Sequence, residues 1–506
     1  MKRFVYVSIV GLLSVVGLLM SAGRKTNLDV LDVGSRLEIL IDRFLIDRMS
    51  GVQLRLASPV DAGIAIQFDK PWEGLFCNFV TVLKDGPTYK LYYRGKRAVG
   101  KDGTPDEVTC YAASSDGIHW TKPDLGLFEV DGTRANNVVL DKTHQPAPHN
   151  FSPFVDTRPG VPASERYKAL GGLFDMEGHV SSGGVLAFVS PDGLRWSRLK
   201  DKAVINHSHY RVKYNDTSPP AVFWSESERR YVAYLRVWEG TTDRAGWGGS
   251  IRWIGRTTSE DFVNWSPVEF MSREGTPVEQ LYLNQTTPYF RAPHIYIGLA
   301  ARFMENRKVV TNEQAEALHL GTNQFIGHCS DGVLITSRGG TTYDRSFMEG
   351  FVRPDIGPEN WTARSNYPAR GVVPTGDNEM SFYVVRHYGY PTVHLRRYTL
   401  RVDRFSSVNA PYSGGELVTK FLRFHGSQLL INFATSAPGG IRVEIQDETG
   451  RAIPGFTLSE ATELIGNEIE RVVSWQRGSD VSALAGKTIR LRFAMKDADL
   501  YALRFR

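Results

Sequence analysis

The chain has 506 residues, enough for two domains. Its 48 glycines, 25 prolines and 11% aromatic residues favour a loop-rich all-β protein over a helical one. The net charge of +5 is small for this length, and no basic stripe with interleaved aromatics is seen, so the sequence does not support a nucleic-acid partner.

The first 23 residues have the layout of a secretory signal peptide. Two basic residues precede an apolar stretch from Phe4 to Met20, and small residues follow as far as Gly23. An uncleaved anchor is the alternative, because this stretch approaches the ~20 residues that span a bilayer. We expect residues 1–23 to be removed on export, leaving a periplasmic or extracellular monomer without membrane contact.

Three similar heptapeptides follow at intervals of about 70 residues: "SSDGIHW" at 114–120, "SPDGLRW" at 190–196 and "SEDFVNW" at 259–265. Weaker copies are present at 337–345 and 401–408. Ser, Asp and Gly are turn-forming residues, and each turn is preceded by strand-like runs of β-branched and aromatic residues. The second strands expected in the five units are 89–95, 167–172, 231–238, 295–303 and 380–389.

A repeat of this length with four strands per unit is the pattern of a β-propeller. The sequence therefore predicts a five-bladed β-propeller over residues 50–410, with each turn joining the third and fourth strands and its aromatic wedged between blades. Unrelated hairpins of a sandwich are the alternative.

Residues 411–506 differ in character, with a linker-like "PYSGGEL" followed by short alternating strands. This segment is predicted to be a β-sandwich domain. The chain has only three cysteines, Cys77, Cys110 and Cys329, so one disulfide at most is expected, and buried thiols are favoured.

Polar and aromatic residues occur before each expected first strand and after each expected second strand. In a propeller these positions line a funnel on one face, where ligands bind. Amides, carboxylates, arginines and flat rings are the groups that bind carbohydrates. Glycosidic cleavage also needs two carboxyl groups roughly 5 to 9.5 Å apart. The predicted catalytic residues are Glu73 and Asp216, as base or nucleophile and charge modulator, and Glu239, as general acid. The predicted substrate-binding residues are Trp72, Asn78, Arg94, His149, Asn284, Arg302, Glu305 and His387.

The "YRG" after "CNFVTVLKDGPTYKLYY", the turn "TTSEDFVNW" and the trailing sandwich resemble the five-bladed propeller glycoside hydrolases of families 32, 43 and 68. The resemblance implies a hydrolase acting on fructans, arabinans or related plant or algal glycans. It departs from the family in the first blade, where Asn78 stands at the position of an aspartate. The Arg–Asp–Pro motif of the family's third blade is also absent, and Asp216 lies at an offset position in "NDTSPP". The Glu–Cys pair, whose glutamate is the general acid of the family, is absent as well.

We therefore predict a secreted glycoside hydrolase with a carbohydrate substrate and neither metal ion nor cofactor. A non-catalytic glycan-binding propeller is the main alternative, favoured by Asn78. A sialidase-like enzyme would need three arginines and a tyrosine converging at the centre, whereas the arginines here are expected around the rim. A lyase using His149 or His387 is a further alternative.

Overall fold

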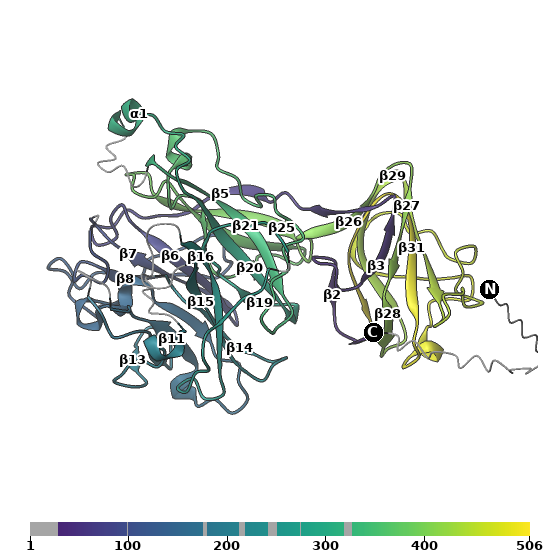
Figure 1. Ribbon diagram of the computed structural model, residues 1–506, viewed down its shortest axis with the longest axis horizontal. Coiled ribbons are helices and arrows are strands. Elements are labelled where there is room, and N and C mark those ends of the chain that lie inside the picture. The colour runs from purple at the N-terminus through teal and green to yellow at the C-terminus, as the bar shows by residue number, and fades with distance from the viewer. Residues whose placement is uncertain are drawn as a thin grey trace, which may run out of the picture.

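A computed structural model describes residues 29–98, 100–175, 180–211, 218–240, 250–273, 275–317 and 326–506. The predicted signal peptide and Asp216 lie outside these residues. Within them the chain is almost entirely β and forms two bodies, seen at the left and right of Figure 1. None of the helices in the described ranges is long and apolar enough to cross a membrane.

The first three blades are four-stranded antiparallel sheets whose strands follow one another in chain order. The predicted second strands are confirmed as β7, β11 and β15. Blade one consists of β6 (Asn78–Asp85), β7 (Thr88–Gly95), β8 (Val108–Ser114) and β9 (Val138–Leu140). Blade two consists of β10 (Ser152–Val155), β11 (Tyr167–Gly171), β12 (Leu186–Ser190) and β13 (Ser197–Arg198). Blade three consists of β14 (Ala221–Ser225), β15 (Arg230–Glu239), β16 (Ile251–Ser259) and β17 (Glu269–Phe270).

In blades four and five the inner strand is split into two short pieces that pair with the same second strand. Blade four consists of β18 (Leu281–Leu283), β19 (Thr287–Tyr289), β20 (Ala292–Met304) and β21 (Cys329–Ser337), and the short helix α1 (Asn312–Ala317) lies between its last two strands. Blade five consists of β22 (Tyr367–Pro368), β23 (Val373–Pro374), β24 (Glu379–Arg386), β25 (His394–Arg401) and, from the other end of the chain, β5 (Val60–Gln67).

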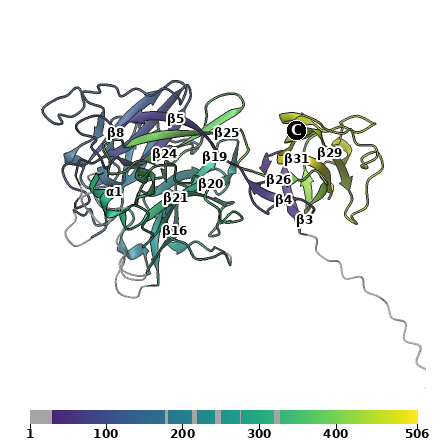
Figure 2. The same ribbon diagram turned by 90° about the horizontal axis from the view of Figure 1, so that it is seen from above.

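The ring closes through that last strand. β5 pairs antiparallel with β25, with His394 opposite Gln67 and Thr399 opposite Val60 (Figures 1 and 2). The predicted fifth turn at 401–408 is therefore corrected, because after β25 the chain leaves the propeller for the other body. An outer strand taken from the N-terminal side ties the first and last blades together.

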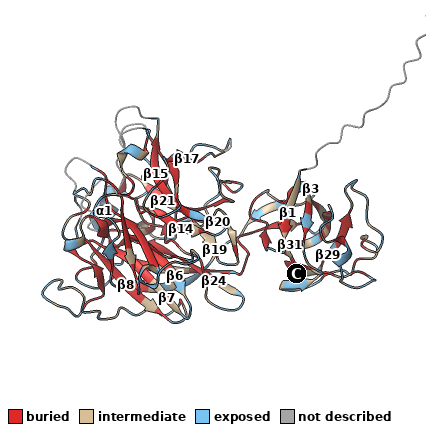
Figure 3. Ribbon diagram, turned by 90° about the horizontal axis from the view of Figure 1, so that it is seen from below, coloured by how far each residue is buried: buried red, intermediate tan, exposed pale blue. Residues whose placement is uncertain are grey.

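The centre of the ring is held by Arg370. Its backbone pairs with Val80 and Val82 of β6, and its guanidinium donates to the carbonyl oxygen of Val222 at 2.8 Å and to that of Pro153. One residue of blade five thus bonds to blades one, two and three. The ribbons of the inner strands β6 and β14 are mostly red in Figure 3, the colour of buried residues. Burial lowers the pKa of Arg370 to about 9.

The repeated heptapeptides fold as capped turns. In the first, the Ser114 hydroxyl accepts the N–H of Gly117 at 2.8 Å, and Asp116 Oδ1 accepts the N–H of Ile118 at 2.7 Å. The same bonds recur at 190–196 and 259–265. The fourth residue of the heptapeptide has a positive φ, 74° at Gly117, which explains the glycine of the motif.

The turns also join neighbouring blades, as predicted. The hydroxyl of Tyr92 in blade one donates to the carbonyl of Gly193 at 2.9 Å, and its ring packs edge-on against Trp196. Tyr383 of blade five donates likewise to the Gly117 carbonyl, and Trp120 packs against its ring. Each turn therefore carries an aromatic contact from one blade to the next.

The second body is the predicted sandwich, so the predicted fold class is confirmed. Five of its strands precede residue 411, outside the predicted range, and all three cysteines are free and buried. The strands before residue 411 are β1 (Val30–Gly34), β2 (Glu38–Ile39), β3 (Ile46–Ser50), β4 (Gln53–Leu56) and β26 (Ser406–Ala410). The others are β27 (Gly415–Thr419), β28 (Phe421–Phe424), β29 (Leu429–Gln446), β30 (Asn467–Val472) and β31 (Arg490–Phe505).

The two bodies meet at a buried ion-pair network. Glu38 of β2 has no exposed surface. Arg338, which follows β21 of blade four, donates to Glu38 and to Asp42 at 2.7 Å each, and His294 Nε2 lies 3.1 Å from Glu38. Burial opposes ionisation, but His294, Arg338 and Arg36 lower the pKa of Glu38 to about 2. The contact thus depends on an ionised carboxylate.

We expect this contact to weaken in acid. The folded pKa of Glu38, about 2, is below the 4.5 of a free glutamate. Its contribution to stability is therefore complete above pH 4.5 and is lost as the pH falls towards 2, at most about 3 kcal/mol. Urea unfolding between pH 6 and 3 should show a smaller pH dependence for Glu38→Gln than for the wild type. Glu468→Gln, at an exposed ion pair, is the control, and equal slopes for Glu38→Gln and the wild type would contradict the assignment.

Candidate functional site

One face of the propeller gathers side chains from all five blades. This face holds the ends of the second strands, the starts of the third strands and the loops that enter each blade. On it lie Arg94 near the end of β7, Trp238 in β15, Arg252 in β16, Phe303 in β20 and Tyr388 after β24. We call it the ligand face.

A buried polar network lies on the ligand face between blades one and two. Nη1 of Arg94 lies 3.3 Å from Nε2 of His149, and His149 Nδ1 lies 2.8 Å from Oε2 of Glu107. Nζ of Lys96 donates to Glu107 at 2.5 Å and to Asp102 at 3.1 Å. We call these five residues the hub network. Although burial opposes ionisation, His149, Arg94 and Lys96 lower the pKa of Glu107 to about 2, so it is ionised at neutral pH.

Three groups of the hub network have the spacing of a metal site. One ligand atom from each of Asp102, Glu107 and His149 lies within 4.8 Å of the others. The Lys96 ammonium, however, bonds to both carboxylates and supplies the positive charge that a cation would bring. Hydrogen bonding within the network therefore accounts for this cluster without a metal.

Arginines and aromatic rings form a second group, which we call the arginine–tyrosine cluster. The guanidinium carbons of Arg236, Arg252 and Arg364 lie 4.6, 5.7 and 5.8 Å from the ring centre of Tyr282. Tyr388 links this cluster to the hub network, because its hydroxyl accepts from Arg94 at 3.2 Å and from Arg364 at 3.4 Å.

The electrostatics at Tyr282 are unusual for a buried phenol. Burial raises the pKa of a tyrosine, but the charges of Arg364, Arg236 and Arg252 outweigh burial here and lower the pKa of Tyr282. From the sequence we expected the arginines to be spread around the rim of the propeller. In the structure three of them, Arg236, Arg252 and Arg364, lie against the ring of Tyr282.

Three predicted substrate-binding residues lie together. Asn78 is paired with Arg94 across β6 and β7, and Arg94 contacts His149. Asn78 is bound to the backbone N–H of Phe79 through its Oδ1 at 2.8 Å, and the ring of Phe79 lies under the Arg94 guanidinium. The structure therefore brings Asn78, Arg94 and His149 together, whereas most of the other predicted site residues have partners elsewhere.

Trp72 and Glu73 instead contact the interior of blade one. Trp72 Nε1 donates to Asn137 at 2.8 Å. Glu73 is fully buried, and its carboxylate accepts from Lys122 and from the Lys70 N–H, both at 2.8 Å, as well as from a tyrosine hydroxyl. These bonds engage both oxygens of Glu73, so its predicted catalytic role would require a partner to leave.

Glu239 and Glu305 lie at the ends of β15 and β20, each beside an arginine. Glu239 pairs with Arg273, and Glu305 Oε1 accepts from Arg252 at 2.7 Å. Burial opposes ionisation of Glu305, but Arg252 lowers its pKa. Arg252 belongs to the arginine–tyrosine cluster, so Glu305 borders that cluster.

The other predicted binding residues have local partners. Arg302 forms a two-pronged pair with Asp331, with Nε 2.9 Å from Oδ1, and Asn284 accepts the N–H of Thr286 at 3.1 Å. Nδ1 of His387 lies 2.9 Å from the Thr392 hydroxyl, and burial, with a smaller effect of a neighbouring histidine, lowers the pKa of His387 to about 4. His387 is therefore neutral at pH 7.

Sequence reasoning missed Asp102, Glu107 and Arg364. The first two belong to the loop between the second and third strands of blade one, and that loop also ends on the ligand face. The acidic "KDGTPDE" at 101–107 was a visible signal. Arg364, in the loop that enters blade five, had no pattern to mark it.

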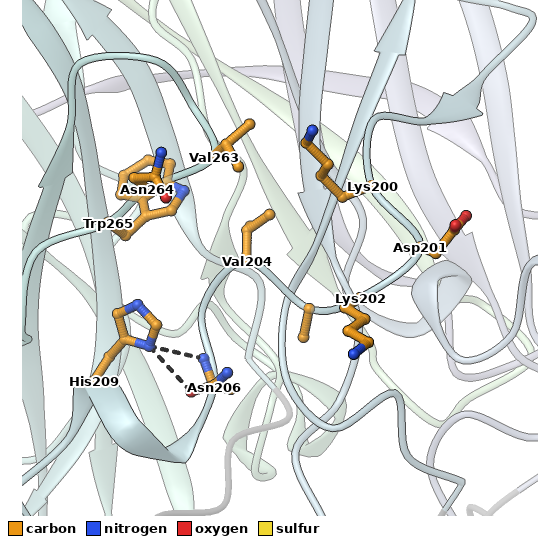
Figure 4. Close-up of a pocket in the computed structure, with 10 residues that line it drawn as sticks. Lys200, Asp201, Lys202, Val204, Asn206, His209, Val263, Asn264 and Trp265 are labelled. Carbon is orange, nitrogen blue, oxygen red and sulfur yellow. Dashed lines mark hydrogen bonds between the residues drawn. The ribbon is translucent and has the colours of Figure 1, made fainter.

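A separate pocket of about 540 Å³, with both polar and apolar walls, lies between blades two and three (Figure 4). Of the predicted site residues that the structure describes, none lines this pocket. Its wall includes one face of the third capped turn, and the residues drawn there include Lys200, Lys202, Asn206, His209, Asn264 and Trp265.

The sequence matches no protein-family model, and a search of curated proteins finds no match. Solved structures that match include a glycoside hydrolase, with 11% identity over 68% of this chain and 92% of that chain and a TM-score of 0.46. A glycosyl hydrolase from Bacteroides ovatus matches at 14% identity over 71% and 95%, with a TM-score of 0.39. A β-fructofuranosidase from Schwanniomyces occidentalis complexed with fructosyl-erythritol matches at 13% identity over 92% and 99%, with a TM-score of 0.37. Identities this low do not carry an activity from one chain to another.

Proposed function

We propose that the chain is an exported glycoside hydrolase that binds a poly- or oligosaccharide on the ligand face. The supporting observation is that all five blades contribute to one connected group of side chains, in which guanidinium groups, carboxylates, an imidazole and aromatic rings lie within contact distance. These are the groups that hold sugar hydroxyls and sugar rings. The hub network and the arginine–tyrosine cluster would bind and orient the substrate.

Hydrolysis needs an ionised carboxylate and a proton donor. Glu305, predicted from the sequence to bind substrate, is ionised beside Arg252, and in this proposal it acts instead as base or nucleophile on the ligand face. Glu239, in the acid role predicted from the sequence, would have to release Arg273 when substrate binds. Asp216 keeps its predicted role as base, nucleophile or charge modulator.

A non-catalytic glycan-binding propeller is the second candidate, and one observation favours it. Asp102 and Glu107, both on the ligand face, have pKa values below their usual range, so neither is a proton donor at neutral pH, and the proposed donor Glu239 is paired with Arg273. Under this candidate the protein would bind a glycan and form no product.

The test is turnover by isosteric variants. Purified protein is screened against aryl-glycosides and polysaccharides, and the product anomer is read by NMR. Replacing the acid or the base by its amide is expected to lower kcat by ~10² to 10⁴-fold without changing the melting temperature. The variants are Glu239→Gln, Glu305→Gln, Asp216→Asn and Glu73→Gln, with Glu463→Gln in the sandwich as the control.

Activity retained in all four variants would remove the assignment. For Glu73→Gln, a fall in melting temperature with unchanged kcat would show that Glu73 supports blade one. Binding of a polysaccharide without any product in the wild type would favour the second candidate.

A further inference from the structure

The pocket between blades two and three lies apart from the ligand face. Asn264 and Trp265 in its wall belong to the turn after β16, whereas Arg252, at the start of β16, lies on the ligand face. A strand of this length spans roughly 25 Å, at about 3.3 Å per residue. The pocket volume of about 540 Å³ is within the range of small-ligand sites, about 300 to 1,000 Å³.

Three side chains of the pocket wall have hydrogen-bonding roles that their neighbours fix. Asn206 Oδ1 accepts from the N–H and the hydroxyl of Ser208, at 3.0 and 2.7 Å, so both lone pairs of this oxygen are used. His209 Nδ1 therefore accepts the N–H of Asn206 at 3.2 Å, and the ring proton is on Nε2. Asn264 Nδ2 donates to Asp261 at 2.7 Å.

The opposite end of each of these side chains is available to a ligand. Within the part of the chain that the structure describes, Nε2 of His209, Nδ2 of Asn206 and Oδ1 of Asn264 have no hydrogen-bond partner. Figure 4 shows the bonds from His209 to Asn206 on one side of the imidazole ring and the other nitrogen turned towards Trp265. The wall thus presents two donors and one acceptor, each held in place by a bond on its other side.

The rest of the wall decides which class of ligand fits. Its apolar part consists of Ala203, Val204, Val263 and Trp265. Lys200, Lys202 and Asp201 bring charges of both signs. An anionic group would face the Asn264 acceptor and the Asp201 carboxylate, and an apolar molecule would leave the donors without partners. A sugar ring matches both walls, because its hydroxyls donate and accept while its faces carry C–H groups.

We infer that this pocket is a second glycan-binding site, which holds a sugar unit of a polysaccharide and anchors the polymer to the propeller. The inference rests on the proposed function for the class of ligand. A polymer that occupies the pocket stays close to the ligand face, so its effective concentration there is raised. A short substrate that occupies only the ligand face gains nothing from the pocket.

The test is affinity electrophoresis of the full chain in gels that contain inulin, arabinan, xylan or polygalacturonic acid. At least one of these polymers is expected to retard the wild type, and the dependence on polymer concentration gives a Kd. Asn264→Ala and His209→Phe each remove one of the wall's hydrogen-bonding groups and should raise this Kd about fivefold.

His119→Ala is the matched control. His119 occupies in the first capped turn the position of Asn264 in the third, and its Nδ1 lies 2.7 Å from Asp116, as Asn264 is bonded to Asp261. His119 does not line the pocket, so this variant should be retarded like the wild type.

Two results overturn the inference. One is that none of the four polymers retards the wild type, and the other is that the Kd is unchanged in every folded pocket variant. Melting temperatures show which variants are folded. If His209→Phe does not fold, because it loses the bond to Asn206, Asn264→Ala still decides.

The kinetics of a short substrate separate the inference from the proposed function. Asn264→Ala should leave kcat and KM for an aryl-glycoside unchanged and raise KM for the polymer. Retardation that depends on the pocket, without any product, would support the inference and contradict hydrolysis. Hydrolysis of a polymer with the same KM in the wild type and in Asn264→Ala would support hydrolysis and contradict the inference.

Discussion

Gly371→Ala is expected to destabilise the propeller by about 3 kcal/mol or more, because two independent constraints are violated. Gly371 has a φ of 113°, which residues with a side chain rarely adopt, and a Cβ there would lie 2.1 Å from the carbonyl oxygen of Val82. The residue follows Arg370, whose backbone bonds join blade five to blade one. A backbone shift that relieves the clash would therefore break the hydrogen bonds of Arg370 with Val80 and Val82, which join blade five to blade one.

Gly376→Ala is the matched control in the same segment. A Cβ at Gly376 would meet no atom closer than 3.6 Å, and its φ is not in the restricted range. Urea unfolding should show a lower midpoint for Gly371→Ala and little change for Gly376→Ala. Equal midpoints for the two variants would show that the contact between blades one and five does not limit stability.

The second large effect is expected at Glu107. Its buried carboxylate accepts from Lys96 at 2.5 Å, from the N–H of Gly103 at 3.1 Å and from His149. Glu107→Gln removes the nearer and fully buried one of the two carboxylates that compensate Lys96, and Asp102 remains at 3.1 Å. Breaking a buried pair costs about 3 to 5 kcal/mol, and we expect a loss of at most this size. The variant should also weaken glycan binding, because His149 and Arg94 lose their support.

A double variant identifies the cause. Adding Lys96→Met to Glu107→Gln removes the ammonium that has lost its nearer carboxylate and should recover part of the lost stability. Glu463→Gln, at an exposed pair with Arg442, should change the free energy of unfolding by less than about 1 kcal/mol. If Lys96→Met gave no recovery, the loss would come from the bonds to Gly103 and His149, and the ion pair would be secondary.

The repeated elements of the fold could be predicted because their signals are local. The turn at Ser114–Trp120 contains the serine and aspartate that accept its backbone hydrogen bonds. The aromatic residues that mark the strand Tyr89–Gly95 likewise lie within a few residues of one another. The closing strand Val60–Gln67 could not be placed, since its partner His394–Arg401 lies more than 300 residues away. Strands before residue 60 were missed in the sandwich for the same reason.

The site shows the same division. Arg94 and His149 were predicted to converge because both occupy strand ends of a known kind. Glu73 occupies a similar position in the sequence, but its side chain turns towards Lys122, which no short-range pattern reveals. The contact between Arg364 and Tyr282 depends on how blade five packs against blade four, so sequence spacing alone could not predict it.

Arg370 has a consequence for how any ligand would reach the protein. Because its guanidinium joins inner strands on opposite sides of the ring, the Arg370 side chain crosses the axis of the ring and blocks it at that depth. A polysaccharide cannot be threaded through the molecule. Only a chain end, a side branch or a bent segment could descend as far as Arg370, and it would have to leave by the way it entered.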